Sequence, residues 1–130
     1  MKGYSELEVF GVKERTLFYR TVDLIAALPE KDQNNELFRC HEIARFIGHV
    51  LDLEVMDGRY EYGCEHSWCV IPHSVGKGFS ILDPYAVGRI PMVQLICTLH
   101  TMPNRYFPEV CRKDIKHDVV DFLIQRFRGE

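Results

Sequence analysis

Apolar residues change their spacing at Leu53, and this change restricts the chain to folds that combine helices with a sheet. Before Leu53 they recur at intervals of three and four, as in an amphipathic helix, over about residues 13 to 28 and again from about 36 or 39 to 51. After Leu53 they form short runs typical of strands, around residues 53 to 55, 60 to 62, 68 to 71 and 79 to 82. A last helical pattern covers about residues 115 to 127 and is closed by Gly129. This order predicts an α+β fold.

Turn residues separate the predicted strands. Asp57-Gly58 and Gly76-Lys77-Gly78 are typical of hairpin turns. The segment from 92 to 99 favours a short helix, although its β-branched residues also suit a strand. No linker rich in proline, glycine or serine and no internal repeat divides the sequence, so we expect residues 1 to 130 to form a single domain.

The composition excludes several classes of protein. Hydrophobic residues make up 46% and charged residues 27% of the 130, which excludes a largely disordered chain. The formal net charge of -3 offers no basic excess for nucleic acid or for an anionic membrane, so neither is expected as a partner. The sequence shows no secretory leader and no apolar run of about eighteen residues, which predicts a cytoplasmic location or else export without a cleaved leader.

The cysteines differ in their surroundings. There are five of them, an odd number, so at least one thiol stays free or pairs between chains. Three have apolar neighbours and are expected to be small buried residues: Cys69, Cys97 and Cys111. Cys40 instead lies in the first turn of the second predicted helix, where the helix dipole and exposed backbone N–H groups favour the nucleophilic thiolate.

A thiolate that attacks an acyl carbon needs an imidazole to hold the ion pair and to protonate the leaving group. His66 is the best placed of the six histidines, because it opens a strand-like run that ends at Pro72. Asp83 ends the next predicted strand, and an antiparallel pairing of the two strands would set its carboxylate beside His66. The sequence therefore predicts a triad of Cys40, His66 and Asp83.

These residues carry a resemblance to a known superfamily. Cys40 on a helix, then His66-x-Trp68, then Ile81-Leu82-Asp83-Pro84 resembles the core of the transglutaminase-like family, which shares a papain-like architecture. The likeness covers about residues 34 to 90, under half of the chain. It depends on the order and spacing of short motifs, each of which is common alone.

The resemblance implies a fold and a set of roles. The fold would have a papain-like (transglutaminase-like) core, in which the nucleophile helix packs on a small antiparallel sheet. Cys40 would be the nucleophile, His66 the general base and acid, and Asp83 the group that fixes the imidazole tautomer. The implied activity is hydrolysis or acyl transfer at an amide bond of a peptide or protein substrate, through a thioester and without a cofactor. Arg39 departs from the family, which often has a small residue just before the cysteine.

Asn34 is the candidate second donor of an oxyanion hole, beside the backbone N–H of Cys40. It precedes the cysteine by six residues, which resembles the placement of the side-chain donor in papain-type enzymes. The alternative is that Asn34 and Asn35 only cap the helix that begins near Cys40.

Two other functions stay open. A zinc-stabilised domain would take ligands from Cys64-x-His66-x-x-Cys69 with Cys40 or His41, although a regular strand points Cys69 away from the other two. A non-catalytic binding module would keep the fold without a working triad. Cys64 shares a strand face with His66, so it is also a candidate for redox regulation.

The segment from His41 to Arg45 imitates the helix motif of zinc proteases, but Arg45 stands where the second histidine ligand is required. The motif therefore fails. Glu42 and Arg45 are instead expected on a solvated helix face.

Overall fold

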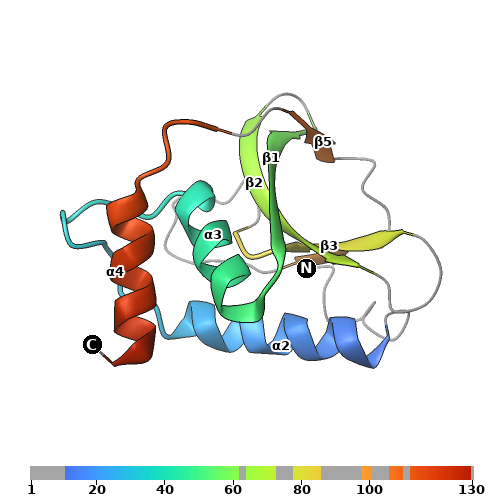
Figure 1. The fold of residues 1–130 in the computed structure, drawn as a ribbon, viewed down its shortest axis with the longest axis horizontal. Helices are drawn as coiled ribbons and strands as arrows, with labels where there is room; N and C mark the ends of the chain where they lie inside the picture. Colours follow the sequence, from blue (N-terminus) through green and yellow to red (C-terminus); the bar gives the residue numbers. More distant parts are fainter. Residues whose placement is uncertain are drawn as a thin grey trace.

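In a computed structural model of the chain, the described residues form three helices and one antiparallel sheet, which confirms the α+β class (Figure 1). The structure describes residues 11–61, 64–72, 78–85, 98–100, 106–109 and 112–129. The elements are α2 (Val12–Ala26), α3 (Cys40–Leu51), β1 (Glu54–Tyr60), β2 (Cys64–Pro72), β3 (Phe79–Asp83), β4 (Thr98–His100), β5 (Tyr106–Pro108) and α4 (His117–Arg128).

The strands lie in the order β4-β3-β2-β1-β5, and each neighbouring pair is antiparallel. The predicted pairing of the two strands that carry the triad candidates is confirmed, because β2 and β3 pair from Cys69 opposite Leu82 to Pro72 opposite Phe79. Side chains alternate between the two faces of a strand. Val70 pairs with Ile81 on one face, so His66 and Asp83 belong to that same face.

Helix α3 occupies the centre of the molecule. Figure 1 shows it between α4 and the sheet, with α2 running past its C-terminal end. The helical spacing of its apolar residues explains this position. Ile43, Ala44 and Ile47 are completely buried, in one cluster with Phe18 of α2 and Leu123 of α4. The opposite face of the sheet carries a smaller cluster: Trp68, Ile81 and Tyr106.

The predicted helices are confirmed to within a few residues. The second begins at Cys40, so this residue lies in the first turn as predicted. The last ends at Arg128, followed by Gly129 with a φ of 78°, a left-handed conformation that glycine adopts without a steric penalty.

The hairpin turn predicted at Asp57-Gly58 is wrong, because β1 runs through both residues. Asp57 is buried and holds an ion pair with Arg45 of α3. Gly58 pairs with Pro108 of β5, and a Cβ at this position would collide with the backbone of Phe107. Glycine is needed here for the close approach of a neighbouring strand, not for a turn.

Several predicted features lie outside the described residues. These are the tip of the second turn at residues 76 and 77, Cys97, Cys111 and most of the segment from 92 to 99, although its last two residues belong to strand β4. Among the helices that are described, none has both the length and the apolar character needed to cross a membrane.

Candidate active site

Cys40 is the first residue of α3, and its side chain is half-buried. The N-cap residue, Arg39, is extended and makes no side-chain capping hydrogen bond in the described part of the chain. The uncapped N–H groups and the helix dipole therefore place positive potential at the thiol. Arg39 instead pairs with Glu42, its Nη2 lying 2.6 Å from Oε2, and this contact fixes the start of the helix.

Glu42 and Arg45 were expected on a solvated face, and this prediction is wrong. Glu42 is buried, and its Oε2 also accepts a hydrogen bond from the backbone N–H of Lys116 at 3.0 Å. Arg45 binds the carboxylate of Asp57 through two N–H groups, at 3.0 and 2.7 Å. The helix therefore carries ion pairs on its inner surface that join it to other segments, and apolar periodicity does not reveal them.

His66 and Asp83 form a buried pair on one face of the sheet. Nε2 of His66 lies 2.7 Å from Oδ2 of Asp83, and each side chain is 1% exposed. The same carboxylate accepts a hydrogen bond from the hydroxyl of Tyr106 at 2.9 Å and one from the backbone N–H of Tyr85 at 3.1 Å. These contacts hold the carboxylate in place, and the carboxylate orients the imidazole.

The second ring nitrogen of His66, Nδ1, is buried without a well-aligned hydrogen bond among the described residues. The imidazole of His66 is nevertheless close enough to Cys40 for the two groups to influence each other's ionisation. Burial alone would raise the pKa of Cys40, but hydrogen bonding and charge from His41 and His66 outweigh it and lower the pKa to about 6.

The pKa of the His66 imidazole is shifted upward, opposite to that of the Cys40 thiol. Burial would lower its pKa, but the charge and hydrogen bond of Asp83, followed by those of Cys40, raise it to about 9. A thiol with a pKa near 6 beside an imidazole with a pKa near 9 is ionised at neutral pH. The resulting thiolate and imidazolium are the reactive form of a cysteine nucleophile.

A second histidine, His41, also contacts the thiol. Sγ of Cys40 lies 3.6 Å from Nδ1 of His41. The same nitrogen lies 2.8 Å from the hydroxyl of Ser67, and this hydroxyl donates to Asp57 at 2.5 Å. Sequence reasoning considered His41 only as a zinc ligand and did not consider Ser67. The available signal was strand alternation, which turns Ser67 toward α3 when His66 faces the other way.

Aromatic rings enclose the imidazole of His66. The ring centroids of Tyr60, Trp68 and Tyr106 lie 6.0, 6.1 and 6.3 Å from that of His66. An apolar groove of about 450 Å³ opens on this face of the sheet and is lined by Glu54, Met56, Trp68, Val70, Phe79, Ile81, Tyr106 and Pro108. Trp68 and Tyr106 therefore belong both to the groove and to the surroundings of the histidine.

Asn34 does not join this cluster. Its side chain is exposed and donates to Oδ2 of Asp118 at 3.4 Å, and its backbone N–H donates to Asp32 at 2.8 Å. Asp32 closes the loop before the helix, also accepting from Glu36 at 3.1 Å. The capping role considered for Asn34 is not observed either, because the helix is preceded by Arg39.

The zinc site finds no counterpart in the described residues, which contain no group of three potential ligands placed to hold a metal ion. Cys69 and His66 lie on opposite faces of β2. Cys69 is fully buried against α3 and donates to the backbone carbonyl of Ala44 at 3.3 Å. Its apolar surroundings raise the pKa of its thiol, as predicted for a structural cysteine. The side chain of Cys64 is not among the described ones.

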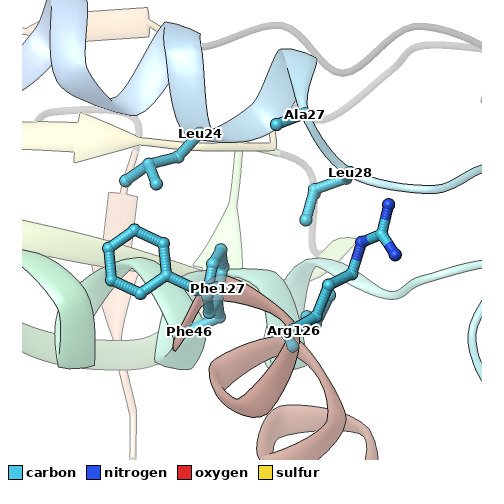
Figure 2. Close-up of a pocket in the computed structure, with 7 residues that line it drawn as sticks. Leu24, Ala27, Leu28, Phe46, Arg126 and Phe127 are labelled. Atoms are coloured by element: carbon cyan, nitrogen blue, oxygen red, sulfur yellow. The ribbon is translucent and has the colours of Figure 1, made fainter. Parts of the chain in front are cut away.

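A second cavity, of about 350 Å³, lies between the helices (Figure 2). Leu24 of α2 and Leu28, just after this helix, face Phe46 of α3 and Phe127 of α4 across it, with Arg126 at one side. It shares no residue with the cluster around Cys40. We therefore assign it no part in the chemistry.

Comparisons with protein-family models, with curated proteins and with solved structures return no match. The function is therefore argued from the geometry of the chain itself.

Proposed function

We propose that this protein is a cysteine-nucleophile hydrolase or acyltransferase that acts on an amide bond of a peptide or protein, and that its α+β fold is a reduced papain-like, transglutaminase-like core. The observation that carries the proposal is the buried His66–Asp83 pair, 2.7 Å apart, beside a helix-terminal thiol whose pKa is about 6. A structural cysteine needs no such partner, and Cys69 has none of these features.

The first half of the reaction follows from this arrangement. The Cys40 thiolate attacks the carbonyl carbon, and the backbone N–H groups at the start of α3 stabilise the oxyanion. The His66 imidazolium then gives its Nδ1 proton to the departing amine as the carbon–nitrogen bond breaks. Asp83 keeps the other nitrogen protonated throughout, so the ring acts through Nδ1 alone.

The second half consumes the thioester. Nδ1 of His66 removes a proton from water or from an acceptor amine, which attacks the acyl carbon and expels the Cys40 thiolate. Water gives hydrolysis and an amine gives acyl transfer. All the groups required belong to the chain, so the proposed reaction uses no cofactor, and a free thiol nucleophile suits a reducing compartment such as the cytoplasm.

The test is the acyl-enzyme itself. Incubation with thioester or p-nitrophenyl ester donors should add one acyl group to Cys40, detected by intact mass and peptide mapping and removed by hydroxylamine. Cys40→Ala should abolish the adduct, whereas Cys69→Ala, the matched control, should leave it unchanged. If no donor in a broad panel acylates Cys40 while the thiol still reacts with iodoacetamide at pH 6, the proposed activity is wrong.

The second candidate is a binding module without catalysis, and the apolar groove beside Trp68 favours it. Trp68 is the only tryptophan of the chain, so its fluorescence reports on ligands that enter the groove. Ligand binding that is equal in the unaltered protein and in Cys40→Ala, with slow and uniform alkylation of all thiols, would favour this candidate over the enzyme.

A further inference from the structure

Cys40 has a second imidazole beside it that the proposed triad does not use. Its sulfur lies 3.6 Å from Nδ1 and 3.9 Å from Nε2 of His41. His41 is buried, so its ring is held in the protein interior next to the thiol. Free rotation into solvent is not available to it.

The surroundings of Asp57 determine how this ring is protonated. Its carboxylate accepts two hydrogen bonds from Arg45, at 3.0 and 2.7 Å, one from the hydroxyl of Ser67 at 2.5 Å and one from the backbone N–H of Arg112 at 2.9 Å. Burial would raise the pKa of Asp57, but these donors lower it to about 2. Asp57 is therefore ionised at neutral pH and can only accept hydrogen bonds.

The direction of each remaining hydrogen bond follows. A serine hydroxyl carries one proton, and Ser67 gives it to Asp57. Toward His41 the hydroxyl can then only accept, so the 2.8 Å contact is a bond that Nδ1 of His41 donates. Nδ1 keeps its proton whether the ring is neutral or cationic. Only Nε2 of His41 can gain or lose a proton.

We propose that His41 is a positioning residue of the reactive site, held by Ser67, Asp57 and Arg45, and that its cationic form stabilises the Cys40 thiolate in addition to His66. When the thiol ionises, its proton passes from Sγ to Nδ1 of His66. The positive charge on His41 requires a second proton, which Nε2 takes from solvent water. This inference rests on the proposed function, because it concerns the same nucleophile.

For catalysis, this means that the two imidazoles have different roles. His66 gives up its proton to the leaving group, so its positive charge disappears during the reaction. His41, with Nδ1 tied to Ser67, keeps a charge next to the sulfur and the start of α3 while this happens. A positive charge therefore remains beside the sulfur after His66 has become neutral and the tetrahedral oxyanion has collapsed to the thioester.

Other charged and titratable groups surround the thiol and the two rings. From the sheet side these are Asp83, which holds His66, and Tyr85, whose pKa is raised by burial and by the charge of Cys40. On helix α3 the neighbouring group is Glu42. Burial would raise the pKa of Glu42, but hydrogen bonds from Arg39 and Lys116 lower it, and the charge of His41 lowers it further by a smaller amount. None of these groups changes in the variants below.

The test measures the alkylation rate of Cys40 by iodoacetamide from pH 5 to 10 on the full chain, by mass analysis of its peptide. His41→Gln keeps a polar side chain but removes the titratable nitrogen. We expect its rate at pH 6 to fall on the order of fivefold and to rejoin that of the unaltered protein above about pH 9.5, where the thiol is ionised in both.

Two variants of Ser67 test the hydrogen bond between its hydroxyl and Nδ1 of His41. Ser67→Ala frees the ring of His41 and should lower the rate at pH 6 in the same direction by a smaller factor. Ser67→Thr restores the hydroxyl and should restore the profile. Ser80→Ala removes another buried hydroxyl, from β3, and serves as the matched control with an unchanged profile.

Two results would overturn the inference. One is a His41→Gln profile that superimposes on that of the unaltered protein. The other is an equal loss of rate at every pH, since damaged packing or access acts without regard to ionisation. If His41→Gln does not fold, the Ser67 pair decides alone. Alkylation needs no substrate, so failure of the proposed function would appear separately, as a normal pH profile without an acyl-enzyme.

Discussion

Replacement of Asp83 by asparagine tests the electrostatics of the site most directly. The pKa of His66 is about 9 in the folded chain, against an ordinary value of 6.5. The difference of about 2.5 units corresponds to roughly 3 kcal/mol that favours the charged ring. Against the effect of burial, the charge and hydrogen bond of Asp83 are the main sources of this free energy.

Asp83→Asn keeps the shape of the side chain and removes the charge. Without it the imidazolium loses its main support, and the thiolate loses the cation that it faces. If the pKa of Cys40 rises by about two units, from about 6 to about 8, the thiolate fraction at pH 7 falls from about nine tenths to about one tenth. We therefore expect alkylation of Cys40 at pH 7 to slow about tenfold.

Two measurements check this prediction. Nuclear magnetic resonance of the His66 ring should give a titration midpoint near 9 in the unaltered protein and a lower one in Asp83→Asn. The alkylation profile gives the matching change in the thiol. Asp121→Asn, on the exposed side of α4, removes the same charge and should change neither. A His66 midpoint near 6.5 in the unaltered protein would refute the reasoning.

Three further outcomes are expected. Gly58→Ala should destabilise the fold by about 1 to 3 kcal/mol in urea unfolding, because the added methyl group collides with β5, whereas Gly129→Ala should cost about 1 kcal/mol for its left-handed backbone alone. The folded pKa of Asp57, about 2, lies below its ordinary value of 3.8, so its ionised form should stabilise the fold above about pH 4 by roughly 2 kcal/mol. This contribution should disappear as the pH falls toward 2, and the pH dependence should flatten in Asp57→Asn. Cys69 should resist iodoacetamide until the chain unfolds, as peptide mapping would show, because burial raises the pKa of its thiol.

The elements of the fold were largely predictable, because each has a clear local pattern. Helix α3 repeats its apolar residues at helical spacing, and it begins close to the predicted start, so that Cys40 lies in its first turn as predicted. The turn at Asp57-Gly58 failed because the same dipeptide serves two purposes. It can form a tight turn. Inside a strand, it can instead place a buried carboxylate at Asp57 and leave room at Gly58 for a closely approaching strand, and here the pairing with β5 determines the outcome.

The meeting of His66 with Asp83 could be predicted from strand pairing alone, since both residues follow the register of β2 and β3. The contact of the second imidazole, that of His41, with Cys40 could not be predicted in this way. His41 acts through Ser67 and Asp57, which come from two different strands, and the sequence does not state how a helix is rotated over a sheet. Asn34 failed for a related reason, because its true partner, Asp118, lies in α4 and is distant in sequence.

The central position of α3 has a consequence for how the thiol responds to heat and denaturant. Eight of its twelve residues are buried: His41, Glu42, Ile43, Ala44, Phe46, Ile47, Gly48 and Leu51. A helix enclosed in this way cannot detach by itself, so its hydrogen-bonded backbone amides, from Ile43 onward, should exchange with deuterated water only when the whole molecule opens. Cys40 thus begins a helix that should be among the slowest-exchanging parts of the chain, so the low pKa of its thiol should persist up to the melting transition and be lost there in a single step.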